Sequence, residues 1–438
     1  MANSEQTTAP HPAATPPGRR RVLTAGAALG LVAALAPVAS ASASASATTA
    51  APPEPPAPTV PPPPPGPAPK LVLPRPTGPH PIGTTSVRLV DAGRRDPWLG
   101  GPVRELMVQF WYPTRPAGRG RTARGHHPLA PWMDREAAKV HQRSTWMYEG
   151  YVVLADTHAR LGAPADTSAG PRPVILHSPG AGMYRAASTS LVEDLASHGY
   201  VVVTIDHTYD AAQVEFPGGR VETYAVGDIE ANVLKAVEVR VADTRFVLEE
   251  LSRIARSRTP GGGHRLPHGL AGPGGVLDLG RTAMFGHSLG GATAISALGA
   301  GAPFRAVVNL DGTVFGPVVG TGVDRPVLLM GADEPEDTSW QEIRPRLRSW
   351  CRTVQIRGTA HRSFTDEQTF LPQAAERIGA TTEQLDLAIG PLARRGQRGV
   401  DIQRDHLRAY FDHFVRGRPR PGFLDRPSRT YPEVRFLR

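Results

Sequence analysis

The chain has 438 residues and carries 49 Lys+Arg against 40 Asp+Glu, a formal net charge of +9 at pH 7. Its single cysteine, Cys351, excludes an intramolecular disulfide framework, a cysteine-based zinc finger, a CxxC redox site and a cysteine-ligated iron–sulfur cluster. Glycine and proline, at 46 residues each, indicate that one part of the chain is unstructured and the rest globular.

The amino terminus has the features of an export signal. Arg19, Arg20 and Arg21 precede an apolar run to about Val38, and an alternating Ala-Ser stretch follows. The paired arginines before Val-Leu resemble the twin-arginine signal, which carries folded proteins across the bacterial membrane. We therefore expect residues 1–47 to be an export signal and the protein to be secreted or at the cell surface. The alternative is an uncleaved anchor, because about 17 weakly apolar residues could just cross a bilayer.

A proline-rich segment follows the signal. Twelve of the eighteen residues from 52 to 69 are proline, so this stretch favours polyproline II and acts as a semi-rigid spacer. We expect residues 48–82 to form a disordered linker and residues 83–438 to form one catalytic domain.

The remaining chain alternates strand and helix patterns. Two β-rich runs, 85–90 and 106–112, suit an antiparallel edge, and 114–147 reads as a surface insertion. Six short apolar runs are typical of strands buried on both faces of a parallel sheet: 174–176, 201–205, 282–285, 306–308, 327–330 and 354–356. Helical periodicity marks the segments 188–197, 229–251, 290–298 and 401–415. This order predicts an α/β fold with a mostly parallel central sheet flanked by helices.

The motif G-x-S-x-G stands between a predicted strand and a predicted helix. It runs from Gly286 to Gly290, with Ser288 at its centre. A sharp strand-to-helix turn strains the backbone of the nucleophile and leaves no room for side chains at its neighbours, which the two glycines satisfy. We expect Ser288 to be a catalytic nucleophile; the alternative is an ordinary glycine-rich turn with a passive serine.

A serine nucleophile needs a histidine base and an acid that orients it. His361 follows a short strand near the end of the domain, where the order Ser, acid, His puts the base. His287 is the variable position inside the motif, and His177 and His207 precede the serine, so we expect all three to have other roles. Two carboxylates, Asp311 and Asp333, each follow a predicted strand, and the residues alone leave both open as the acid.

Acyl transfer also needs donors for the developing oxyanion. One donor should be the backbone N–H of Leu289, directly after the nucleophile. The second should come from the glycine-containing loop Ser178-Pro-Gly-Ala-Gly182, in which we assign the N–H of Ala181. This chemistry requires no metal or other cofactor, and no HExxH motif or dinucleotide fingerprint is present.

Five motifs in order resemble the platelet-activating factor acetylhydrolase family. They are Arg104-Glu-Leu-Met-Val-Gln-Phe-Trp-Tyr-Pro113, Ser178-Pro-Gly-Ala-Gly182 with Asp194-Leu-Ala-Ser-His-Gly-Tyr200, Gly286-His-Ser-Leu-Gly-Gly291, Leu310-Asp-Gly312 and Gly358-Thr-Ala-His361. The resemblance implies an α/β-hydrolase fold, a Ser288-Asp311-His361 triad and hydrolysis of carboxylic esters. In this family the substrates are typically short or oxidised acyl groups on phospholipids, and the resemblance favours Asp311 over Asp333.

Other functions stay open at this point. The same chemistry could serve a short-chain lipase or a cutinase-like polyester hydrolase. A noncatalytic surface-binding protein is a further alternative, based on the proline-rich stalk and on residues 394–438, which hold 12 Arg against 5 Asp+Glu. That basic segment is either a solvated tail or a peripheral contact with lipid or cell-wall polymer. The excess of Arg over Lys reflects compositional bias, so we expect no nucleic-acid partner.

Overall fold

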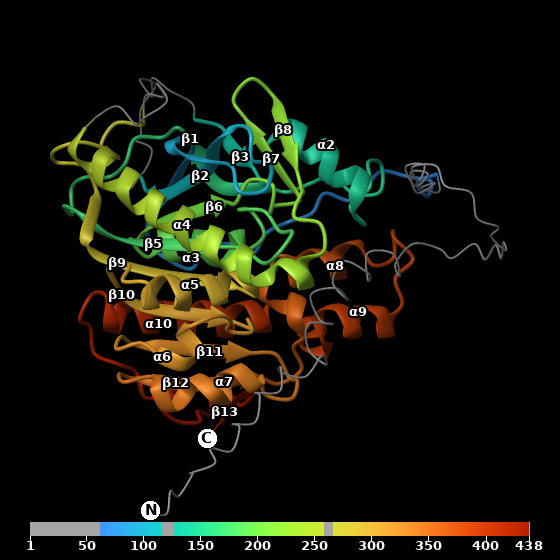
Figure 1. Cartoon of the computed structure of the whole chain (residues 1–438). Coiled ribbons are helices and arrows are strands. Elements are labelled where there is room, and N and C mark those ends of the chain that lie inside the picture. The colour runs from blue at the N-terminus through green and yellow to red at the C-terminus, as the bar shows by residue number, and fades with distance from the viewer. Residues whose placement is uncertain (1–61, 116–126, 258–265, 438) are drawn as a thin grey trace, which may run out of the picture.

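A central sheet of eleven strands organises the chain (Figure 1). The computed structural model describes residues 62–115, 127–257 and 266–437. Within them the strand order is β13-β12-β11-β10-β9-β5-β6-β2-β1-β4-β3. The strands are β1 (Ile82–Arg95), β2 (Val103–Pro113), β3 (Leu129–Pro131), β4 (Asp156–Leu161), β5 (Arg172–Ser178), β6 (Val201–Asp206), β9 (Leu277–His287), β10 (Phe304–Leu310), β11 (Val327–Gly331), β12 (Cys351–Ile356) and β13 (Val434–Leu437). A separate hairpin pairs β7 (Gln213–Phe216) with β8 (Arg220–Thr223).

The middle of the sheet is parallel, as the apolar runs predict. The five successive pairs from β6 through β5, β9, β10 and β11 to β12 all run parallel. The antiparallel pair predicted from 85–90 and 106–112 forms β1 and β2, although β4 and β3 lie outside it and make the actual edge. The predicted fold class, a mostly parallel sheet with flanking helices, is confirmed.

Helices cover both faces of this sheet (Figure 1). Alternate residues of a strand face opposite ways, so in β9 Met284 packs with α4 and α5 whereas Phe285 packs with α3 and α10. Burial on both faces explains why these strands contain short continuous apolar runs, such as Val174–Leu176 in β5 and Val327–Met330 in β11. The helices are α2 (Arg135–Ser144), α3 (Thr189–Ser197), α4 (Ile229–Arg256), α5 (Leu289–Gly299), α6 (Val318–Thr321), α7 (Thr338–Ile343), α8 (Glu367–Ala374), α9 (Thr382–Ile389) and α10 (Arg398–Phe414).

The segment 114–147 is more than a surface insertion. Its described part contains β3 and α2 and buries Trp132 and Trp146. These side chains share an apolar cluster with Phe370 and Leu371 of α8. The segment therefore belongs to a third apolar cluster, in addition to the two that cover the faces of the main sheet.

The expected linker boundary at residue 82 is wrong, because the packed structure starts earlier. Leu71 and Leu73 are each 1% exposed and belong to the same third cluster. The backbone around Leu71 exchanges hydrogen bonds with Val153, with N–O distances of 2.9 Å in both directions. The apolar Leu71-Val-Leu73 run, which lies just after the prolines, is the physical reason. The export signal, 1–47, and linker residues 48–61 lie outside the described residues.

The basic segment 394–438 is largely folded rather than a free tail. It contains α10, whose Arg404 is 3% exposed and donates to the carbonyls of Pro74, Arg75 and Ser190. Several of its other arginines pair with nearby carboxylates, including those of Asp412 and Glu433. Among the helices of the described ranges, none has the length and apolar character needed to span a membrane.

Candidate active site

Ser288 occupies a strained turn between β9 and α5. Its backbone has φ 54° and ψ −124°, a conformation that side-chain-bearing residues rarely adopt. The N–H of Ser288 donates to the carbonyl of Leu310 at 2.8 Å, which fixes the turn against the end of the neighbouring strand β10. This turn raises the serine side chain at the carboxyl end of the parallel sheet, as the motif predicts.

The glycines around Ser288 are required by close backbone packing. A Cβ on Gly290 would lie 1.9 Å from the carbonyl oxygen of Ser178, and one on Gly286 would lie 2.3 Å from the backbone of Gly290. A Cβ on Gly291 would lie 2.1 Å from the side-chain oxygen of Asn309. No side chain fits at these positions, so α5 can begin directly against the sheet.

Asp311 follows β10 and holds the imidazole of His361. Its carboxylate oxygen Oδ2 lies 2.6 Å from Nδ1 of His361, and its Oδ1 accepts the N–H of Ala332 at 2.8 Å. Asp311 also has a positive φ of 55°, and its N–H donates to the carbonyl of Met330. The turn after the strand is thus shaped so that the carboxylate reaches across to the histidine loop.

Asp333 contacts a different part of that loop. Its Oδ2 accepts the N–H of Gly358 at 2.9 Å, and its own N–H donates to the carbonyl of Thr359 at 3.1 Å. These bonds support the backbone that leads to His361. Of the two candidate acids, the structure brings Asp311 to the imidazole.

The contact with Asp311 changes the acidity of His361. Burial lowers the pKa of His361, but the hydrogen bond and negative charge of Asp311 outweigh it and raise the pKa above the ordinary histidine value. Because Asp311 accepts the proton on Nδ1, the neutral ring leaves Nε2 free to accept a proton. This is the protonation state that a general base needs.

His287 supports the His361 segment, a role that the sequence does not reveal. Its Nε2 lies 3.0 Å from the carbonyl oxygen of His361, and the two ring centroids are 4.5 Å apart. Burial and the adjacent His361 lower the pKa of His287 well below the usual value, so its ring is neutral and Nε2–H is the donor. The only sequence signal for this contact is the position of His287 next to Ser288, the candidate nucleophile.

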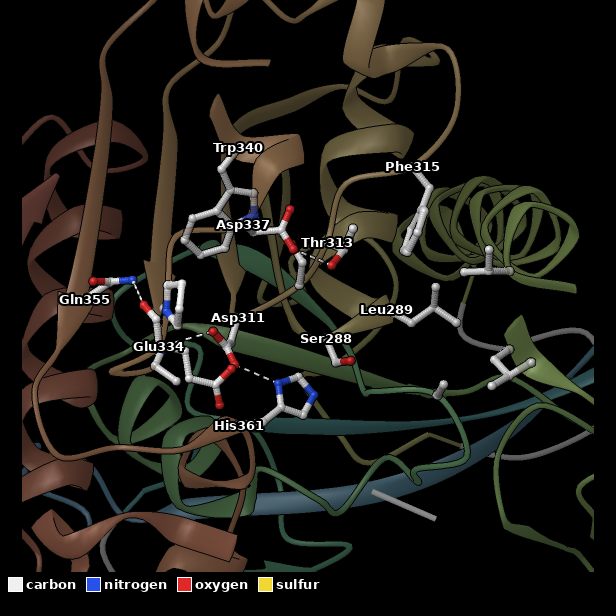
Figure 2. Close-up of a pocket in the computed structure, with 17 residues that line it drawn as sticks. Ser288, Leu289, Asp311, Thr313, Phe315, Glu334, Asp337, Trp340, Gln355 and His361 are labelled. Atoms are coloured by element: carbon white, nitrogen blue, oxygen red, sulfur yellow. Dashed lines mark hydrogen bonds and ion pairs between the residues drawn. The ribbon is translucent and has the colours of Figure 1, made fainter. Parts of the chain in front are cut away.

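One small cavity collects the predicted site residues. Ser288, Leu289, Asp311, His361 and Ala181 all line it, and its volume is about 100 Å³. Figure 2 shows the imidazole of His361 between the carboxylate of Asp311 and the side chain of Ser288. The apolar part of the lining consists of side chains such as Ile229, Val233, Phe315 and Trp340. In the described part of the chain, no group of three or more His, Cys, Asp or Glu side chains could hold a metal ion.

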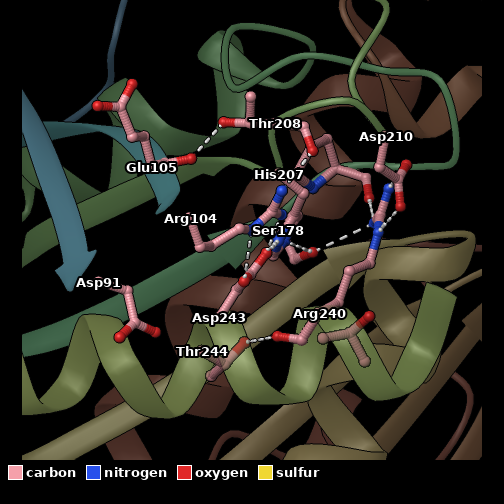
Figure 3. Close-up of polar contacts among 12 residues, drawn as sticks. Asp91, Arg104, Glu105, Ser178, His207, Thr208, Asp210, Arg240, Asp243 and Thr244 are labelled. Carbon is pink, nitrogen blue, oxygen red and sulfur yellow. Dashed lines mark hydrogen bonds and ion pairs between the residues drawn. The ribbon is translucent and has the colours of Figure 1, made fainter. Parts of the chain in front are cut away.

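A buried polar network lies behind the loop that carries Ala181 (Figure 3). Ser178 Oγ lies 2.9 Å from Nε2 of His207, whose Nδ1 lies 2.9 Å from Oδ2 of Asp243. This Ser-His-Asp chain resembles a catalytic triad, but all three side chains are fully buried. Arg104 pairs with Asp243 and completes the charge balance. The network is therefore structural, in agreement with the expectation that His207 is not the base.

Arg240 of α4 connects this network to the loop backbone (Figure 3). Its guanidinium donates to the carbonyls of Pro179 at 2.5 Å and Gly180 at 3.0 Å, and it pairs with Asp210 at 2.5 Å. In a trans peptide the carbonyl and the following N–H point in opposite directions. Holding the Gly180 carbonyl against Arg240 therefore turns the N–H of Ala181 away from the network.

A family model agrees with this architecture. The model described as platelet-activating factor acetylhydrolase, isoform II, matches residues 66–250 and 268–388. The matched residues include the packed segment 71–73, which we call the strap, and both loops that carry the candidate oxyanion donors. They also include Ser288, Asp311 and His361.

Individual relatives are similar over long stretches. A probable 1-alkyl-2-acetylglycerophosphocholine esterase of Arthroderma benhamiae is 25% identical over 394 residues, covering 84% of this chain and 94% of the relative. The platelet-activating factor acetylhydrolase of Cavia porcellus is 27% identical over 210 residues, 44% of this chain and 48% of that protein. A solved structure, the ferulic acid esterase from Streptomyces cinnamoneus, has a TM-score of 0.68 at 34% identity and covers 84% of this chain and 99% of its own. The chain belongs to the platelet-activating factor acetylhydrolase family and is a carboxylic ester hydrolase.

Proposed function

We propose that the enzyme cleaves its ester through a Ser288-His361-Asp311 triad. The observation that carries this proposal is the 2.6 Å hydrogen bond between Asp311 and His361 at the mouth of a cavity that Ser288 also lines. Ser288 Oγ attacks the ester carbonyl carbon while His361 Nε2 takes its proton. The tetrahedral intermediate collapses, His361 protonates the departing alkoxide, and the acyl group stays on Ser288. Water, deprotonated by His361, then releases the acid.

The oxyanion of that intermediate is assigned to two backbone donors. Leu289 is the first residue of α5, and the first amides of a helix have no intrahelical acceptor, so its N–H is available. The N–H of Ala181 is the second donor, turned away from Arg240 by the hydrogen bond on the Gly180 carbonyl. Each such donor typically contributes about 2.7–4 kcal/mol to the transition state.

The preferred substrate is proposed to be a short or oxidised acyl ester of a phospholipid. Family membership supports this class, and the volume of about 100 Å³ beside Ser288 suits a short acyl group better than a long chain. Short-chain lipase and cutinase-like polyester hydrolase activities use the same chemistry. A second candidate substrate class is an ester with an aromatic group, because the similar solved structure is a ferulic acid esterase.

A fluorophosphonate probe tests the nucleophile. The wild-type protein should be labelled, and Ser288→Ala should not. Labelling of the variant would refute the triad, and an unlabelled wild type would argue against a serine nucleophile. Hydrolysis of a 2-acetyl phospholipid, a tributyrin emulsion and a polyester film, compared with p-nitrophenyl esters of graded chain length, then separates the substrate classes. A preference for long acyl chains would contradict the short-acyl proposal.

We also propose that the protein is exported and acts outside the cytoplasm. The twin-arginine-like run of Arg19, Arg20 and Arg21 before Val-Leu supports this. The basic segment 394–438 is proposed as a weak peripheral contact with lipid or cell-wall polymer. Changing all three arginines to lysine should retain the protein in the cell, as fractionation would detect. Export that is unaffected by the triple change would reject this signal.

A further inference from the structure

Ala181 lines a second cavity, of about 380 Å³, besides the one that contains Ser288. Its walls come from α2 and the residues after it, from Gly182 to Tyr184, from the end of β8, and from the residues after His361. The volume lies in the range of small-molecule sites. If the ester carbonyl of a substrate accepts the N–H of Ala181, the acyl or alcohol group next to that carbonyl lies beside this cavity.

Aromatic side chains dominate the chemistry of the second cavity. Trp132, Trp146, Tyr184 and Tyr224 line it, and the two tryptophans are only 3% and 4% exposed. Trp132 meets Tyr184 edge to face, with ring centroids 5.5 Å apart at 90°. His141 extends this arrangement, with its ring 4.9 Å from that of Tyr184. Rings held edge to face in this way offer both edges and faces to another aromatic ring.

The two carboxylates at this cavity are already engaged. Asp366 accepts the amides of Thr189 and Ser190 at the start of α3, and the indole N–H of Trp132. Glu367 is ion-paired with Arg362. No carboxylate of the cavity wall is therefore free to balance a cationic head group. This disfavours a cationic occupant.

Two neutral polar rings complete the wall. Burial lowers the pKa of His141 to about 3, so its imidazole is uncharged. Burial raises the pKa of Tyr184 well above the usual value, so its hydroxyl keeps its proton. Within the described residues, the Tyr184 hydroxyl has no hydrogen-bond partner. It is a donor available to an oxygen atom of a ligand.

We propose that this second cavity binds the aromatic ring of an ester of the second candidate substrate class, and that the Tyr184 hydroxyl donates to an oxygen substituent on that ring. The inference rests on the proposed function, because it assumes that the ester carbonyl is bound at Ala181 and Ser288. The ring can belong to the acyl or to the alcohol part of the ester, since Ala181 adjoins the reacting carbonyl. A ring on the acyl part and a ring on the alcohol part would make the same contacts in the cavity. Substrates that carry the ring on one part or the other distinguish the two cases.

The test compares kcat and KM for matched esters. Methyl 4-hydroxy-3-methoxycinnamate, methyl cinnamate and methyl butyrate vary the acyl part, and benzyl acetate against methyl acetate varies the alcohol. If the cavity binds the acyl part, the methyl cinnamates should exceed methyl butyrate in kcat/KM by about tenfold or more. If it binds the alcohol part, benzyl acetate should exceed methyl acetate by the same factor. Equal kcat/KM values for the aromatic and aliphatic members of both pairs would overturn the proposal.

Two variants locate the effect in the second cavity. Trp146→Ala should raise KM for the preferred aromatic ester about tenfold and leave methyl acetate within about twofold. Tyr184→Phe keeps the ring and should lower kcat/KM about fivefold for the oxygen-substituted ester but not for its unsubstituted analogue. The matched control is Tyr431→Phe, a buried tyrosine on the carboxyl-terminal segment, which should leave every ester within about twofold.

The outcomes separate this proposal from the proposed function. Ester hydrolysis that persists in Ser288→Ala would reject the triad. Ser288-dependent hydrolysis in which Trp146→Ala and Tyr184→Phe reduce all esters equally would reject the aromatic site alone. Selective loss on a phosphocholine ester, with aromatic esters unaffected, would instead assign the cavity to a cationic head group and overturn the proposal. If Trp146→Ala unfolds, as calorimetry would detect, the isosteric Tyr184→Phe decides.

Discussion

Replacing Arg240 by methionine should reduce turnover by misaligning the Ala181 amide. The side chain is fully buried and donates to the carbonyls of Pro179 and Gly180 while pairing with Asp210. Without these bonds the Gly180 peptide can rotate, and the oxyanion of the proposed mechanism would lose the Ala181 amide as a preorganised donor. Loss of one such donor reduces kcat by about 10²–10³-fold. We expect the lower end, because the Leu289 amide still contributes.

The same substitution destabilises the fold, so the catalytic effect must be isolated. Leaving Asp210 buried without its partner costs about 3–5 kcal/mol in the free energy of unfolding. The double variant Arg240→Met with Asp210→Leu removes both charges and should recover much of that stability, while kcat stays low. Asp210→Asn alone keeps the bonds from Arg240 to the loop carbonyls and serves as the control, with kcat close to wild type.

The assay is steady-state hydrolysis of p-nitrophenyl acetate, measured well below the melting temperature that calorimetry gives for each variant. The loss should fall on kcat rather than on KM, because the donor acts on the charge that develops in the transition state. A folded double variant with kcat within about twofold of wild type would refute the reasoning. In that case the loop would keep its conformation without Arg240.

Three further predictions follow from the described contacts. Asp311→Asn should lower kcat about 10⁴-fold, whereas Asp333→Asn should lower it far less, because it loses only an acceptor for the Gly358 amide. Single-turnover kinetics would compare the two variants, and a larger loss in Asp333→Asn would exclude Asp311 as the acid. Because His361 must be neutral to act as a base and its pKa is raised, kcat/KM should fall as the pH drops through a midpoint above about 6.5; a pH–rate profile with a lower midpoint would contradict the contact with Asp311. Leu71→Ala should cost about 2–5 kcal/mol in urea unfolding, while Val72→Ala, at a position 60% exposed, should change it by less than about 0.5 kcal/mol; equal effects would mean that the strap does not support the fold.

The parallel sheet could be predicted from sequence because each of its strands is buried on both faces. Runs such as Val327–Met330 are continuously apolar, and the turn around Ser288 has its own glycine pattern. The hairpin β7–β8 and the helices α8 and α9 were not predicted, because they are short and depend on tertiary contacts rather than on an apolar period of their own.

The polar residues of the site were also predicted only in part from the sequence. Asp311 and Asp333 both follow the carboxyl end of a parallel strand, so strand position alone cannot distinguish them. The difference lies in which loop each carboxylate meets, which depends on the arrangement of β10, β11 and β12 in space. Arg240 could not be found because a buried arginine within a helical pattern reads as a solvated charge until its partners are known.

The left-handed backbone of Ser288, the proposed nucleophile, lowers the stability of the folded protein. Its φ of 54° with ψ −124° suits glycine, and a residue held in such a region costs about 1–3 kcal/mol. Ser288→Gly should therefore give an inactive protein that melts at a higher temperature than the wild type, a relation that calorimetry can check. The serine side chain is thus kept at a cost in thermal stability. Selecting variants of this chain for melting temperature alone would therefore favour glycine at position 288 and eliminate activity.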